Sequence, residues 1–221
     1  MKKSIFKKAI TDTIPVMTGY LTLGLAFGVI MRTNGFEWYW ACLMAVLIFA
    51  GSMQYVAVGL LTGGAGLITT ALTTFMVNAR HLFYGLSLVE KYKNVGKSKP
   101  YLIFALTDET YSLVCSKDES KEYYLLVTLL DHFYWITGCT LGAILGGFIS
   151  FNTEGLDFAL TALFVSISTE QWLSTKNHLP AIVGAAASAI CLAIFGKDGF
   201  LIPAMIVITV LLLISGKKVK Q

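Results

Sequence analysis

The amino-acid sequence predicts an all-α integral membrane protein, a bundle of six to eight transmembrane helices with broken or re-entrant polar segments. Of its 221 residues, 56% are hydrophobic and 14% are charged, and the mean hydropathy is +0.70, far above that of a soluble domain. The net charge of +4 comes from lysines gathered at both termini and between Lys91 and Lys99. This distribution indicates membrane topology rather than nucleic-acid binding.

Six apolar runs are long enough to cross about 30 Å of hydrocarbon. The first follows a basic start and continues for the length of a full span, so it predicts a retained helix rather than a signal peptide. We expect one polytopic domain over 1–221, with possible halves 10–115 and 123–216. The runs are 14–31, 38–61, 124–149, 157–174, 179–195 and 200–215.

Two further segments, 67–89 and 101–115, are apolar but dotted with polar residues. The lysine distribution predicts that both termini and the loop from Lys91 to Lys99 face the cytoplasm. Six full spans with both polar segments re-entrant or broken satisfy this rule, whereas eight plain helices violate it once. The sequence leaves both topologies open.

Glycines recur at similar places in the two possible halves. Gly19, Gly24 and Gly28 lie in the first run, and a similar series from Gly138 to Gly147 lies in the run 124–149. Two interpretations stay open: an internal duplication, as in many transporters, or Gly-x3-Gly spacing that lets helices pack closely.

The stretch FMVNARHLFYGLSL places Asn78, Arg80 and His81 inside a membrane segment. On an ideal helix Asn78 and His81 lie about 60° apart and Arg80 about 100° from His81, so one narrow face does not hold all three. A lipid-facing arginine at mid-depth costs roughly 2.5 to 3.5 kcal/mol. These residues therefore predict an interrupted helix or a polar cavity; the alternatives are an Arg80 ion pair with Asp108 or Glu109 that only joins helices, or an interfacial Arg80.

A second polar island, FAGSMQ, places Phe49, Gly51, Ser52 and Gln54 in an apolar run. Small residues beside hydrogen-bonding ones favour a helix break whose freed backbone groups meet a ligand. Singly, Gly51 is typical of close packing and Gln54 of an interhelical hydrogen bond.

Thr107, Asp108 and Glu109 place two adjacent carboxylates in a short apolar segment, which makes them candidates for proton uptake and release. The alternative is an acidic interfacial loop. Asp131 and His132 lie near the start of a run and are interpreted as interfacial, outside the site. The four scattered cysteines predict neither disulfides nor a metal site, no cofactor is expected, and the sequence contains no HExxH, GxSxG or phosphate-loop motif of an enzyme.

Four blocks in this order, FAGSMQ, NARHLFYGLSL, TDETY and LDFALTALF, resemble the AzlC/YgaZ family of branched-chain amino acid permeases. The resemblance implies a multi-pass protein of the bacterial cytoplasmic (inner) membrane that exports valine, leucine, isoleucine and toxic analogues such as azaleucine, with methionine as a further candidate. It also implies a small hydrophobic membrane partner of AzlD/YgaH type.

A branched-chain amino acid is a zwitterion with an apolar side chain, so its site needs a cation or helix N-terminus, acceptors for the ammonium group, and an apolar pocket. We expect Arg80, with Asn78 or the backbone near Gly51 and Ser52, to bind the carboxylate. The expected ammonium ligands are Gln54 with Asp108 or Glu109, the apolar pocket is formed by Phe49 and Phe158, and any proton coupling runs through Asp108, Glu109 or His81. A proton or cation channel component and a scaffold subunit without its own substrate site remain the competing functions.

Overall fold

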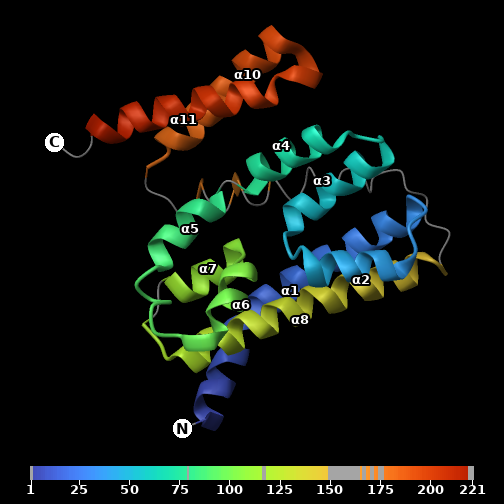
Figure 1. The fold of residues 1–221 in the computed structure, drawn as a ribbon, viewed down its shortest axis with the longest axis vertical. Helices are drawn as coiled ribbons and strands as arrows, with labels where there is room; N and C mark the ends of the chain where they lie inside the picture. The colour runs from blue at the N-terminus through green and yellow to red at the C-terminus, as the bar shows by residue number, and fades with distance from the viewer. Residues whose placement is uncertain are drawn as a thin grey trace. The chain divides into compact units, whose positions relative to one another are not determined.

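The computed structural model describes residues 2–78, 80–115, 118–148, 165, 168–169, 172–173 and 177–218. All regular secondary structure in these ranges is helical. The chain divides into two compact units, Met1–Leu160 and Thr161–Gln221. We describe each unit by itself (Figure 1).

The first unit is built around two long helices, α1 (Lys2–Thr33) and α8 (Lys121–Gly146), which lie side by side (Figure 1). Their 32 and 26 residues correspond to about 48 and 39 Å, longer than the hydrocarbon core of a bilayer. Lys8 forms an ion pair with Glu119 just before α8 begins, and Arg32 lies against Gly146 where α8 ends. The two helices therefore run parallel, from a lysine-rich end to an end that we call the Arg32 end.

Glycines bring the backbones of α1 and α8 into contact. A Cβ added at Gly28 would lie 2.2 Å from the carbonyl oxygen of Cys139, and one at Gly142 would lie 2.2 Å from that of Leu25. A Cβ at Gly24 or at Gly138 would lie 2.9 Å from the opposite backbone. The close-packing interpretation of the glycine spacing is thus confirmed for these four positions, as in small-residue helix pairs of membranes.

Helices α2 (Trp38–Leu47) and α3 (Gly51–Thr62) form a segment that enters and leaves at the same end. Glu37, just before α2, forms an ion pair with Arg32. At the break after α2, Phe49 lies beside Tyr20 of α1, and Tyr55 of α3 packs on Phe27, further along α1. Because α3 returns toward the Arg32 end, the predicted crossing helix over 38–61 is wrong: its polar island breaks it in two.

The next segment connects the two ends of the unit. α4 (Leu67–Asn78) follows α3, and α5 (Arg80–Leu88) leads to the lysine-rich end, where Leu88 packs in a core with Ala9 and Tyr123. A short helix, η1 (Gly96–Ser98), follows.

Helices α6 (Lys99–Phe104) and α7 (Asp108–Cys115) form a second returning segment, entering from the lysine-rich end. At their break Thr107 contacts Tyr20 in the middle of α1, and α7 then returns to Lys91, which donates hydrogen bonds to the carbonyls of Val114 and Cys115. The predicted broken segments are thus confirmed for 101–115, and the break at 48–50 gives the unit two interrupted helical segments that enter from opposite ends.

The second unit contains α10 (Leu179–Gly199) and α11 (Leu201–Lys218), which pack against each other. Gly196, at a φ of 71°, interrupts the helical conformation of α10. Among the described residues, Ser4–Thr33 and Leu179–Gly196 are apolar and long enough to span a membrane by composition and length alone.

Candidate functional site

The two breaks meet in the middle of the first unit. Phe49 adopts a φ of 43°, a left-handed conformation that is unfavourable for a bulky side chain and is held here by its neighbours. Its ring stacks on His132 of α8, with centroids 4.2 Å apart, and meets Tyr20 edge-on. Ala50 provides no side-chain cap for α3, so the first N–H groups of that helix rely on other partners.

The break between α6 and α7 places hydroxyl and carboxyl groups opposite the first break. Thr107 caps α7 through its Oγ1, which accepts from the backbone N–H of Thr110 at 3.3 Å. Asp108 and Glu109 occupy the first turn, where the helix dipole favours negative charge. The TDE motif therefore combines a helix cap with an acidic first turn at the centre of the unit.

Five side chains from α1, α7, α8 and the break before α7 form a continuous polar series, which we call the hydroxyl chain. The hydroxyl of Tyr20 lies 2.7 Å from Glu109 Oε2 and 2.6 Å from Thr107 Oγ1. Thr107 Oγ1 lies 3.1 Å from Thr110 Oγ1, which lies 2.8 Å from Asp131 Oδ2. Asp131 and Thr110 are fully buried, whereas Glu109 is half-buried.

Asp131 and His132 were interpreted as interfacial and outside the site, but both are buried inside the first unit. Their relative exposures are 0% and 8%, and His132 contacts the hydroxyl of Tyr101 at 2.9 Å and the carbonyl of Ala45 at 3.2 Å. The apolar run used to place them begins at residue 124, and α8 begins at Lys121, so Asp131 lies ten residues into the helix, where it packs against the other helices of the unit. An acidic residue next to a histidine in a long helix was the available signal.

Gln54 and Gly51 of α3 both meet Trp135 of α8. The indole N–H of Trp135 donates to Gln54 Oε1 at 2.8 Å, which confirms the interhelical hydrogen bond. A Cβ at Gly51 would lie 3.1 Å from the Trp135 ring, which confirms close packing there. Gln54 is fully buried, and its Nε2 has no hydrogen-bond partner within the described part of the chain. Ser52 is buried in the same turn.

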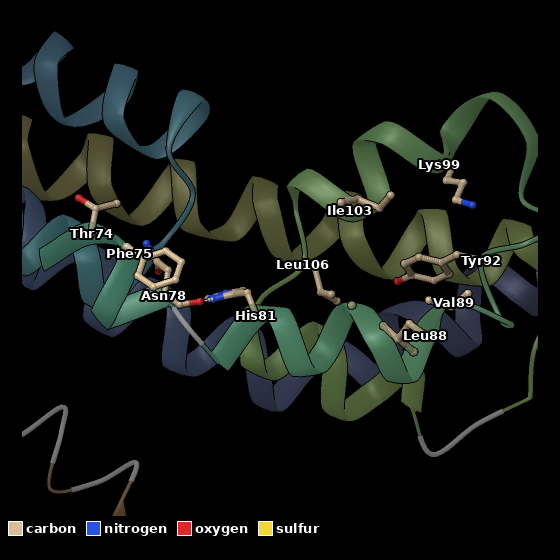
Figure 2. Close-up of a pocket in the computed structure, with 11 residues that line it drawn as sticks. Thr74, Phe75, Asn78, His81, Leu88, Val89, Tyr92, Lys99, Ile103 and Leu106 are labelled. Carbon is tan, nitrogen blue, oxygen red and sulfur yellow. Dashed lines mark hydrogen bonds between the residues drawn. The ribbon is translucent and has the colours of Figure 1, made fainter. Parts of the chain in front are cut away.

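Asn78 and His81 line a cavity of about 410 Å³ between α4, α5 and α6 (Figure 2). His81 Nδ1 lies 3.0 Å from the backbone oxygen of Asn78. Figure 2 shows Tyr92 and Lys99 at the opposite end of this mainly apolar cavity. Leu106, next to Thr107 of the hydroxyl chain, also lines it.

The expected site residues thus fall into two groups. Phe49, Gly51, Ser52, Gln54 and Glu109 lie around the two breaks, whereas Asn78 and His81 lie on the cavity. The side chain of Arg80 and the whole of Phe158 lie outside the described residues. Asp108 adjoins Glu109 in the first turn of α7.

Two helices thus begin at breaks, α3 among aromatic side chains and α7 beside the hydroxyl chain, and helices that begin at a break inside the protein recur in membrane transporters. The fold and the site therefore define a helical membrane protein with buried polar groups.

The AzlC protein family model matches residues 15–149, so the chain belongs to the AzlC family. The Bacillus subtilis branched-chain amino acid transport protein AzlC is 42% identical to it, over 98% of this chain and 87% of the relative. An uncharacterized membrane protein of Helicobacter pylori is 36% identical over 97% of this chain and 96% of its own length. The Escherichia coli inner membrane protein YgaZ is 28% identical over 82% and 80%, respectively. No solved structure matches the chain significantly.

Proposed function

We propose that this chain exports branched-chain amino acids across the bacterial cytoplasmic membrane, as the large subunit of a pair with a small AzlD-type membrane protein. The observation that carries the proposal is that the start of α3, where Ala50 provides no side-chain cap, and the acidic first turn of α7 both adjoin Tyr20: Phe49 meets its ring and Glu109 its hydroxyl. The printed name of the Bacillus subtilis relative, a branched-chain amino acid transport protein, supports the same substrate class.

The carboxylate of the substrate binds to the N-terminus of α3, at Gly51 and Ser52, and to the guanidinium of Arg80. A helix N-terminus supplies N–H donors and a positive dipole, and a guanidinium supplies a planar pair of donors. The sequence assigned Gln54 to the ammonium group, but here we propose that it binds the carboxylate. Its oxygen already accepts from Trp135, whereas its Nε2 is a donor with no partner among the described residues. Asn78 assists from the cavity side.

The ammonium group binds to the carboxyl groups of the α7 break, Glu109 or Asp108. The branched side chain packs against Phe49, with Phe158 as the second apolar contact. Because Glu109 is hydrogen-bonded to Tyr20, a bound ammonium group would meet a carboxyl oriented from α1. Proton coupling, with His81 as a further candidate, runs through the same carboxyls.

The lysine-rich end faces the cytoplasm by the positive-inside rule. The 410 Å³ cavity then forms the cytoplasmic vestibule, since Lys99 and Tyr92 line it at that end and Asn78 and His81 line it at the other. Its size lies within the range of small-molecule sites. Leu106 lines the cavity and precedes Thr107 in the sequence, so in this proposal it is the side chain that an amino acid passes to reach the breaks.

The test is efflux of preloaded radiolabelled leucine and valine from cells that express this chain with and without its small partner. Arg80→Lys keeps the charge but loses the planar fork, so efflux should fall about 10- to 100-fold, the equivalent of about 1.5 to 3 kcal/mol for a charged hydrogen bond. The matched control is Arg32→Lys, whose ion pair with Glu37 lies at the Arg32 end, and it should leave efflux unchanged.

Full efflux by Arg80→Ala would refute the carboxylate assignment. Ion current without dependence on leucine or valine would replace the transporter with a channel component. The Arg80 variants could instead fail to co-purify with the small partner while leucine and valine affinity stays unchanged. That result would favour a scaffold subunit.

A further inference from the structure

The hydroxyl chain links two carboxyl groups through three hydroxyls. Between Glu109 and Asp131 there are four oxygen–oxygen contacts of 2.6 to 3.1 Å, through Tyr20, Thr107 and Thr110. Each contact needs one proton, because two lone pairs facing each other at this distance in a buried site repel. The three hydroxyls supply only three protons.

We propose that Glu109 and Asp131 share a single proton through this chain, which acts as a proton relay between a half-buried and a fully buried carboxyl. When the proton is on Glu109, every hydroxyl donates toward Asp131, which is then the ionised acceptor. When it is on Asp131, every hydroxyl donates toward Glu109. Conversion between the two states breaks four O–H bonds and forms four, and the chain carries one negative charge throughout.

The second observation at the buried end is an acceptor without a partner. Asp131 Oδ1 has no hydrogen-bond partner among the described residues, although Asp131 has no exposed surface. A buried carboxyl oxygen is normally satisfied, so this one is available to a donor. A donor at Asp131 would hold the shared proton on Glu109, whereas an ammonium group bound at Glu109 would move the proton to Asp131.

The titratable groups around the chain leave this count unchanged. Asp108 precedes Glu109 on α7 and is not one of the four contacts. On α8, His132 uses both ring nitrogens, for the hydroxyl of Tyr101 on α6 and for a carbonyl of α2. On α1, Tyr20 is itself a member of the chain.

The test counts protonated carboxyl groups from the infrared C=O stretching band of the full-length protein in lipid vesicles without substrate. In Asp131→Asn a buried NH₂ group at the Oδ1 position would have no acceptor, so the amide oxygen takes that position and the NH₂ group donates to Thr110. Every hydroxyl then turns toward Glu109, and Glu109 loses the proton. In Glu109→Gln an NH₂ group that donates to Tyr20 turns the hydroxyls the other way, and Asp131 loses the proton. Asp131→Asn alone and Glu109→Gln alone should therefore each lose as much C=O band intensity as the variant that carries both substitutions.

Two control variants complete the design. Asp12→Asn removes a carboxylate of α1 that lies outside the hydroxyl chain and accepts from the hydroxyl of Tyr123 at 2.6 Å. Its change in C=O band intensity should therefore add to that of Asp131→Asn. Thr110→Val keeps the shape but cuts the chain, and the Glu109→Gln and Asp131→Asn losses should become additive in that background. Additive losses with Thr110 intact would overturn the proposal.

The use of this relay in transport rests on the proposed function, but the proton count does not. If leucine efflux fails while the single and double variants lose equal C=O band intensity, the transporter is refuted and the relay is supported. If efflux is normal while the losses of band intensity are additive, the transporter is supported and the relay is refuted.

Discussion

The backbone contact between α1 and α8 predicts a large difference between two identical substitutions in one helix. Gly28→Ala would place a methyl carbon 2.2 Å from the carbonyl oxygen of Cys139 and 2.3 Å from the amide nitrogen of Ala143. Comfortable carbon contacts need about 3.5 Å. Since both obstacles are backbone atoms, the helices must separate by about 1 Å.

Overpacking of this kind costs about 1 to 3 kcal/mol. A glycine to alanine change inside a helix also gains up to about 1 kcal/mol from helix propensity. Gly19→Ala isolates that gain, because a Cβ at Gly19 meets nothing within 4 Å. We therefore expect Gly28→Ala to be less stable than Gly19→Ala by about 1 to 3 kcal/mol, toward the upper value because backbone cannot rotate away.

The measurement is the free energy of unfolding of both variants in mixed detergent micelles, followed by circular dichroism. Leucine efflux gives a second readout, because a shift of α1 by about 1 Å would lengthen the 2.6 Å contact between Tyr20 and Thr107. Equal unfolding free energies for the two variants would refute the argument from backbone contact.

Three further predictions follow from single contacts. Trp135→Phe leaves the buried oxygen of Gln54 without a donor and should lower the free energy of unfolding by about 1 to 3 kcal/mol, measured in the same micelles. Lys91→Met removes two hydrogen bonds to the last carbonyls of α7 and should speed amide exchange there about fivefold, whereas Lys93→Met, whose ion pair with Glu90 is exposed, should not. Leu106→Trp should reduce leucine efflux by filling the 410 Å³ cavity without lowering membrane insertion.

Local composition predicted the interruptions of the helices well. The island around Gly51 and Gln54 indicated a break, and the structure places it at 48–50. The acidic motif from Thr107 also lies at a break, and there Thr107 serves as the cap. Breaks are predictable because small and hydrogen-bonding residues act on the adjacent backbone.

Contacts between distant segments were not predictable in the same way. Tyr20 carried no signal, since a tyrosine in a membrane helix is ordinary, yet it joins two motifs that lie almost ninety positions further along the chain. Asp131 was misplaced because hydropathy measures depth from the apolar run alone, whereas α8 carries polar residues at both its start and its middle. The return of α3 toward the Arg32 end also depends on tertiary contacts that periodicity does not encode.

The close packing of α1 and α8 affects how sequence variation in this family should be interpreted. At Gly28 and Gly142 no larger side chain fits, whatever the substrate. Invariant glycines at these positions would therefore reflect the short distance between two backbones rather than a role in substrate binding. Tyr20 and Thr110 face no such limit of space, since a phenylalanine and a valine have nearly the same shapes. Their retention across divergent relatives would therefore record selection for the hydroxyl group itself.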